Sequence, residues 1–117
     1  MTYDERNVFA RILRKEIPAQ LVHEDELCIA FKDVAPQAPT HVLVIPRESL
    51  TSLDDAGADD RVLLGHLLLV AAEVAREQGI AREGYRVVIN TGRHGGQSVP
   101  HLHVHVLGGR EHAWPAG

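Results

Sequence analysis

The chain has 117 residues and a mass of 12.9 kDa, the size of one domain, because two separate cores would each be too small to be stable. Hydrophobic residues make up 44% and charged residues 24%, a globular composition that excludes disordered, collagen-like and low-complexity chains. The 12 basic and 16 acidic residues give a formal charge of −4, so no overall positive field would attract a nucleic acid.

The cysteine content and the hydropathy pattern bear on the compartment. A single cysteine, Cys28, excludes an internal disulfide and a site with several thiolate ligands, which favours a reducing environment. The first six residues contain no apolar signal segment. The longest apolar run, residues 67–72, is far shorter than the roughly 20 residues of a membrane-spanning helix. We therefore expect a cytoplasmic protein, with residues 1–117 forming one domain and no membrane partner.

Two segments have the periodicity of helices. Apolar residues at helical spacing over 7–16 predict a short helix that begins at Asn7 as its N-cap and ends before Pro18. A longer pattern covers 59–78, where the apolar side chains form one stripe and acidic residues occupy the first turn. Gly79 follows immediately, as expected at the C-terminal end of a helix.

Five short β-rich runs predict strands. The run at 41–45 is apolar at nearly every position, which indicates a central strand covered on both faces and ended by Pro46. Two prolines make 34–39 a loop. The predicted strands, in chain order, cover residues 21–24, 26–32, 41–45, 86–90 and 101–107. Strands, then a long helix, then strands indicate an α+β domain with a largely antiparallel sheet.

The last predicted strand carries histidines at alternate positions, His101, His103 and His105. Because residues two apart in a strand point to the same face, the three rings should line one face while the apolar residues between them face the core. Repulsion between rings at this spacing should lower their pKa values and keep at least one ring neutral near pH 7. The neutral form is the nucleophilic form of imidazole.

Three interpretations of this face differ in chemistry. The simplest is a polar strand facing solvent, but histidine is not a strong strand former. The second is a zinc site in which His41 or His94 adds a ligand, although no Cys, Asp or Glu lies nearby in the sequence. The third is phosphorus chemistry, in which the middle ring attacks phosphorus and its neighbours handle charge and protons.

The glycine-rich segment at 91–98 favours phosphorus chemistry. Gly95 and Gly96 permit backbone shapes in which successive N–H groups face one anion, and Gln97 and Ser98 add side-chain donors. A Gly-Gly pair on its own is more often just a turn. Its position directly before three histidines indicates an oxyanion cradle.

The run HLHVHVL at 101–107 matches the His-x-His-x-His pattern of the histidine triad proteins. The chain resembles in particular their Hint branch, the purine nucleoside phosphoramidate hydrolases. Nearly the whole chain takes part in the resemblance, through the blocks FKDVAPQAPTHVLVIPR, LLGHL, GGQSV, LGGR and WPAG. The resemblance implies a roughly five-stranded antiparallel sheet with one long and one short helix, continued across a homodimer.

The resemblance also implies a reaction that uses no metal and no cofactor. His103 would attack the α-phosphorus of a purine nucleoside 5′-phosphoramidate and form a nucleotidyl-histidine, which water would hydrolyse to AMP or GMP. His105 would donate to a phosphate oxygen, and His101 would orient His103. His41 would be the supporting fourth histidine, although a polar residue at the end of a strand is nearly as good an interpretation.

The resemblance implies a nucleotide site as well. Its expected residues are Asp33 as the ribose ligand, Val34, Asn90, Gly96, Gln97, Ser98, His103, His105, Phe9 and Phe31. Read from the residues alone, Asp33 could equally cap its own turn, and Phe9 and Phe31 would be core residues.

Two other functions compete with phosphoramidate hydrolysis. One is dinucleoside polyphosphate hydrolysis, which resembles another branch of the same family; the short chain and the WPAG ending favour the Hint branch. The other is a nucleotide-binding or zinc-binding interaction module in which catalysis is incidental.

Overall fold

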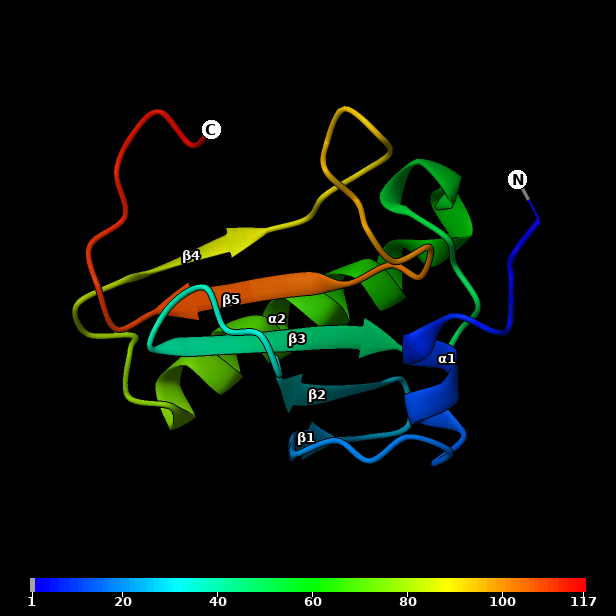
Figure 1. The fold of residues 1–117 in the computed structure, drawn as a ribbon, viewed down its shortest axis with the longest axis horizontal. Coiled ribbons are helices and arrows are strands. Elements are labelled where there is room, and N and C mark those ends of the chain that lie inside the picture. The colour runs from blue at the N-terminus through cyan, green and yellow to red at the C-terminus, as the bar shows by residue number, and fades with distance from the viewer. Residues whose placement is uncertain (1) are drawn as a thin grey trace.

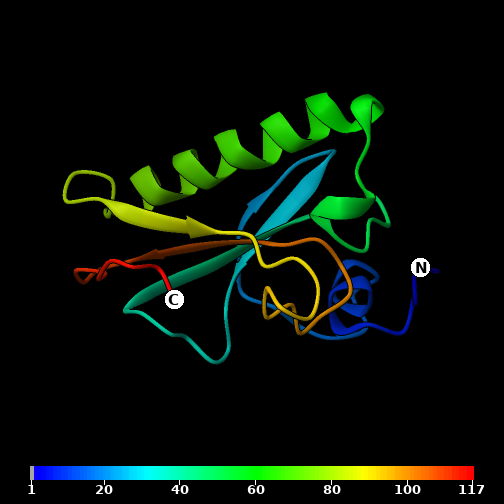
Figure 2. The ribbon, with the colours of Figure 1, turned by 90° about the horizontal axis from the view of Figure 1, so that it is seen from above.

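The protein is built on an antiparallel sheet with one long helix packed across one of its faces (Figures 1 and 2). The computed structural model describes residues 2–117. The sheet has five strands in the order β1-β2-β3-β5-β4. Their bounds are β1 Leu21–Glu24, β2 Cys28–Lys32, β3 Thr40–Pro46, β4 Tyr85–Val88 and β5 Val104–Gly108. The predicted α+β class with five antiparallel strands is confirmed.

The two predicted helices are α1, Val8–Leu13, and α2, Arg61–Glu77. Two 3₁₀ turns, Leu53–Asp55 and Ala58–Asp60, lead into α2, so the helix begins two residues later than predicted. Figure 2 shows α2 along one face of the sheet, with α1, the loop between β2 and β3 and the loop between β4 and β5 on the other. No helix within residues 2–117 is long and apolar enough to cross a membrane.

Alternation along the strands divides the core into two layers. Cys28, Ala30, Val42 and Val44 belong to the layer under α2, together with the valines of β5 and the buried stripe of α2. The strand residues between them belong to a second cluster on the α1 side, which consists of Ile29, Phe31, Leu43 and Ile45 together with Phe9 of α1. Because successive side chains point to opposite faces, the same alternation places the odd-numbered residues of β3 and β5 on the α1 side.

Both helices end in the same capping motif. In α2, the Gly79 N–H donates to the Arg76 carbonyl and the Ile80 N–H donates to the Ala75 carbonyl, with Gly79 at φ 77°, as predicted. In α1, the residue with positive φ is Lys15, at 64°, so the helix ends at Leu13 and not at residue 16 as predicted. A lysine at this position carries no sequence signal for a helix end, because glycine is the residue that usually adopts positive φ.

The last strand also begins later than predicted. Residues 101–103 lie outside the ladder, which starts at Val104. The main-chain groups of this segment bond elsewhere: the Leu102 N–H donates to the Leu50 carbonyl, and the His101 carbonyl accepts from the ring of His103. The alternation continues nevertheless, since Leu102, like Val104, is buried in the layer under α2.

Candidate active site

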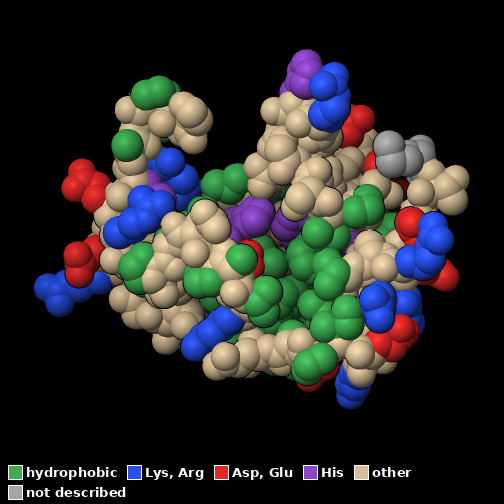
Figure 3. All heavy atoms as spheres, viewed as in Figure 1, with side chains coloured by type: hydrophobic (Ala, Val, Ile, Leu, Met, Phe, Trp, Pro, Cys, Tyr) green, Lys and Arg blue, Asp and Glu red, His purple; other side chains and the backbone are tan. Residues whose placement is uncertain are grey.

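Four histidines converge on the α1 side of the sheet. In the antiparallel ladder Leu43 lies opposite His105 and His41 lies opposite Leu107, so His41 and His105 are diagonal neighbours on one face. The ring centroids are 5.1 Å apart for His41 and His105, and 5.0 Å apart for His105 and His103. Figure 3 shows histidine side chains reaching the surface in the middle of this face, beside a hydrophobic patch.

The ring of His103 is held by a main-chain acceptor. Its Nδ1 lies 2.7 Å from the carbonyl oxygen of His101. Because a carbonyl oxygen only accepts, Nδ1 carries the ring proton, and the neutral ring has its lone pair on Nε2. The edge-to-face contact with Phe9, at 4.9 Å between centroids, packs the ring from one side. The geometry therefore provides a ring nitrogen with a free lone pair and a fixed orientation.

The tautomer of His105 follows from a chain of two hydrogen bonds. The Gln37 N–H donates to Nδ1 of His41 at 3.0 Å, so the neutral His41 ring carries its proton on Nε2. That Nε2 lies 2.9 Å from Nδ1 of His105, which must accept. The neutral ring of His105 consequently carries its own proton on Nε2 and can donate it to a ligand.

His101 is fully buried and is anchored through both ring nitrogens. Its Nε2 donates to the carbonyl oxygen of Pro46 at 2.9 Å, so its Nδ1 accepts from the hydroxyl of Tyr3. His101 thus positions His103 through its main-chain carbonyl and not through its ring. Tyr3 was not among the predicted site residues, because it lies in an N-terminal segment with no periodic pattern.

Burial is the main reason that these rings are neutral. The pKa values of His41, His101 and His103 all lie below the usual 6.5, and desolvation by burial is the largest cause in each. Burial followed by the nearby rings of His103 and His41 lowers the pKa of His105 to about 4. Repulsion between rings, the cause expected from the sequence, is therefore secondary to the loss of solvent.

The glycine-rich loop that precedes the three histidines in the chain is braced by its own side chains. The Asn90 Nδ2 donates to the Gly95 carbonyl at 2.7 Å. The Gln97 Nε2 donates to the carbonyl oxygens of Thr51, at 2.7 Å, and Val99, at 3.0 Å, while its Oε1 accepts from Gly92. Asn90 and Gln97 therefore shape the loop, and the Gln97 amide has no donor left for a ligand.

The predicted anion cradle needs a correction at its main-chain donors. The N–H groups of Gly96 and Gln97 donate within the turn, to the carbonyl oxygens of Arg93 at 3.2 Å and Gly92 at 3.0 Å. These bonds close the turn, so the two N–H groups do not point at a common anion. Ser98 is exposed, and within residues 2–117 neither its N–H nor its hydroxyl has a hydrogen-bond partner. Of the expected cradle residues, Ser98 is the one with available donors.

Comparison with known proteins assigns the chain to a family. A sequence model of the HIT domain matches residues 14–112. The chain belongs to the HIT domain family.

Relatives of this HIT protein cover almost its whole length. It is 57% identical to an uncharacterized HIT-like protein of Synechococcus elongatus, over 97% of this chain and 98% of the relative. It is 48% identical to the purine nucleoside phosphoramidase of Escherichia coli, over 91% of this chain and 89% of the relative. The crystal structure of a HIT family hydrolase from Legionella pneumophila superimposes with a TM-score of 0.92 at 44% identity, covering 94% of this chain and 98% of the other.

The remaining predicted site residues of the HIT protein lie in three different environments. Asp33 accepts from the Ala35 N–H through Oδ1, at 2.9 Å, so it does cap its own turn, while its Oδ2 lies 3.5 Å from Nε2 of His41. Phe9 and Phe31 are buried core residues, and Phe9 also contacts His103. Val34 is 97% exposed, so its side chain lines no pocket in the described chain.

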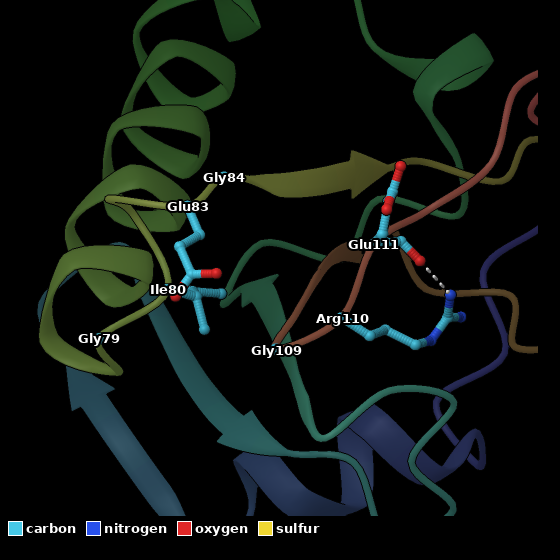
Figure 4. Close-up of a pocket in the computed structure, with 7 residues that line it drawn as sticks. All are labelled: Gly79, Ile80, Glu83, Gly84, Gly109, Arg110 and Glu111. Carbon is cyan, nitrogen blue, oxygen red and sulfur yellow. Dashed lines mark hydrogen bonds between the residues drawn. The ribbon is translucent and has the colours of Figure 1, made fainter.

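Two further features bear on ligand binding in this HIT protein. Donor atoms of Asp33, His41 and His105 lie within 4.8 Å of one another, whereas His94 is exposed on its loop and joins no zinc-type cluster among residues 2–117. A separate hollow of about 450 Å³ lies between the end of α2 and the chain after β5, where Ile80 and Arg110 line it (Figure 4). None of the four converging histidines borders this hollow.

Proposed function

We propose that the protein is a purine nucleoside phosphoramidase that cleaves the P–N bond of purine nucleoside 5′-phosphoramidates and releases AMP or GMP. The observation that carries the proposal is the pairing of two neutral rings with opposite tautomers. His103 presents a lone pair on Nε2, and His105, 5.0 Å away between ring centroids, presents an N–H. The name of the 48% identical relative from Escherichia coli supports the same reaction.

In the first step, Nε2 of His103 attacks the α-phosphorus, the Nε2–P bond forms, and the P–N bond of the substrate breaks. The amine takes up one proton from solvent water as it leaves. The N–H of His105 donates to a nonbridging phosphate oxygen and stabilises the charge that builds up there. The Ser98 hydroxyl and N–H are the loop donors available for the same phosphate.

In the second step, water attacks phosphorus, the Nε2–P bond breaks, and the water releases one proton to solvent, which replaces the proton that the amine took up. A neutral imidazole is a good nucleophile near pH 7, and its cationic phosphoryl adduct is a good leaving group, so one residue serves both steps. The His101 carbonyl accepts from Nδ1–H in both, and holding this proton also stabilises the positive charge of the adduct.

The nucleoside part of the substrate would lie against the wall beside His103. Phe9 offers the apolar contact, and the Asp33 Oδ2 would accept from the ribose hydroxyl groups while its Oδ1 stays bonded to the turn. Phe31 would support this surface by packing in the core. Asn90 and Gln97 would support it by holding the shape of the glycine-rich loop. Val34, whose side chain is exposed, would contact a ligand only through its main chain.

Turnover of two substrate types by matched variants tests this proposal. The wild-type protein should hydrolyse an adenosine 5′-phosphoramidate faster than a diadenosine polyphosphate. His103→Asn, whose amide can keep the bond to the His101 carbonyl, should lower kcat by at least about 10⁴-fold with AMP binding retained. His94→Asn, at an exposed loop histidine, is the control and should match wild type. Full turnover by His103→Asn would overturn the mechanism, and preference for the diadenosine substrate would favour dinucleoside polyphosphate hydrolysis.

A homodimer is the second part of the proposal. β4 is an edge strand, and Val62 and Leu69, two turns apart on α2, are 79% and 72% exposed. The exposed apolar side chains of α2 and the unpaired edge of β4 support a partner that continues the sheet and covers the helix. Sedimentation equilibrium should give twice the 12.9 kDa chain mass, and a mass of one chain would contradict the dimer.

A further inference from the structure

A second cluster of metal-ligating side chains lies on the α2 side of the sheet. It consists of His23 in β1, Asp25 in the turn between β1 and β2, Cys28 at the start of β2 and His66 in α2; we call it the Asp25 cluster. The Asp25 Oδ2 lies 2.6 Å from Nε2 of His23, 2.7 Å from Nε2 of His66 and 3.6 Å from Sγ of Cys28. One carboxylate oxygen thus brings together two imidazoles and a thiol.

The carboxylate of Asp25 is held in place by the turn. Its Oδ1 accepts from the N–H groups of Leu27 and Cys28, at 2.8 and 2.9 Å. These two bonds fix the rotamer and direct Oδ2 at the other three side chains. Main-chain support of a ligand from outside the coordination sphere is a general feature of metal sites in proteins.

The members of the Asp25 cluster differ in solvent exposure. Cys28 is 0% exposed and forms the floor, in the layer under α2. The side chains of His23, Asp25 and His66 keep 17%, 27% and 32% of their exposure. An ion can therefore enter from the solvent side and still reach a ligand in the core.

We propose that the Asp25 cluster is a zinc site, with Nε2 of His23 and His66, Oδ2 of Asp25 and Sγ of Cys28 as four tetrahedral ligands. This mixture of imidazole, carboxylate and thiolate suits Zn²⁺. Donor atoms of His23, Asp25 and Cys28 already lie within 4.8 Å of one another, and His66 is outside this group but contacts Asp25 Oδ2, so its ring must turn toward the other ligands when the ion binds. Bonds of about 2.1 Å to nitrogen and oxygen place tetrahedral ligand atoms about 3.4 Å apart, so the contacts of His23 and His66 with the Asp25 Oδ2 must each open by less than about 1 Å.

The protons balance without a further reactant. On binding, the Cys28 thiol releases its proton to solvent and Sγ bonds to the ion. Each neutral ring binds through Nε2 and carries its proton on Nδ1. Reaction of the thiol as a free nucleophile is a poor alternative, because the Cys28 side chain is buried with 0% exposure.

The site would fasten α2 to the β1–β2 turn and is independent of the proposed phosphoramidase chemistry. Cys28 belongs to the layer under α2, whereas the β3 and β5 residues of the active site face α1. The sequence does not reveal the cluster, since His66 is 38 residues beyond Cys28 and neither lies in a metal-binding motif.

Metal titrations of untagged, chelator-treated protein without nucleotide test the site. We expect one tight Zn²⁺ per chain and, with Co²⁺, a thiolate-to-cobalt charge-transfer band. Cys28→Ser should abolish this band, and His23→Asn, at a more accessible position, should weaken Zn²⁺ binding at least about tenfold if Cys28→Ser does not fold. His94→Asn and His105→Asn are controls and should bind like wild type.

Two results would contradict the zinc site. Absence of the cobalt–thiolate band in the wild-type protein would overturn the site. Zinc binding that survives His23→Asn but is lost in His105→Asn would also overturn it, because the ion would then lie among the active-site histidines. Neither result depends on turnover, so failure of the phosphoramidase proposal would leave this test intact.

Discussion

The Nδ1–H of His103 donates a hydrogen bond to the carbonyl oxygen of His101, two residues earlier, at 2.7 Å. The acceptor is stationary because the His101 ring is itself buried between Pro46 and Tyr3. A main-chain group therefore determines which ring nitrogen of His103 is free. The arrangement explains why a His-x-His pattern is useful even though residues 101–103 lie outside the ladder.

The lowered pKa of His103 predicts where activity is lost in acid. A pKa below 6.5 means that the ring stays neutral as the pH falls through 6.5, and that the lone pair is lost only below the shifted value. The rate kcat/KM should therefore be level near neutral pH and fall about tenfold per pH unit on an acid limb that lies below pH 6.5.

Folding must be followed at each pH in that experiment. The unfolded chain takes up protons on its histidines near pH 6.5 while the buried rings do not, so folding stability falls as the pH drops below 6.5. Circular dichroism separates this loss from ring protonation. An acid limb centred above pH 6.5 in folded protein, or a rate that rises in acid, would refute a neutral His103 nucleophile.

Removal of the His41 ring should disturb the tautomer of His105. The Gln37 N–H donates to Nδ1 of His41, and Nε2–H of His41 in turn donates to Nδ1 of His105. Without the His41 ring, in His41→Asn, nothing fixes the His105 proton on Nε2. We expect kcat to fall by about 10² with a smaller change in KM. Nitrogen-15 shifts of the His105 ring report the tautomer directly.

A purely structural role for His41 would give a different pattern. Stability would fall while the His105 ring kept its proton on Nε2 and kcat per folded molecule stayed the same. His94→Asn again supplies the matched control.

Gly95 should be intolerant of a side chain, in contrast to Gly57. A Cβ at Gly95 would lie against the main chain of Thr91, 2.8 Å from its nitrogen and closer still to its carbonyl oxygen. The loop would have to open and move Ser98, so Gly95→Ala should lower kcat/KM by about 10². Gly57→Ala, with nothing within 4 Å of its Cβ, should match wild type. Equal activity of the two variants would show that loop shape does not matter.

Sequence patterns predicted the fold and the histidine face well because both depend on alternation. The period of two in HLHVHVL holds in the extended segment before β5 as well as in β5 itself, so the apolar residues were placed correctly in the core. The end of α1 was missed because Lys15 adopts a conformation that glycine usually signals.

The partners of individual polar groups could not be predicted in the same way. Gln97 bonds to the carbonyl of Thr51, 46 residues away, and this tertiary bond decides whether its amide is available to a ligand. Tyr3 and His101 are separated by 98 positions. No local pattern encodes such pairs, because they form only when the loops are placed on the sheet.

The most direct test of the account is to trap the covalent intermediate. An adenosine 5′-phosphoramidate is mixed with excess protein, the reaction is stopped without acid to preserve the labile N–P bond, and intact mass and peptide mapping follow. We expect one adenylyl group per reacting chain, on His103. An adduct on another residue, or steady turnover with no adduct during the first cycle, would contradict it.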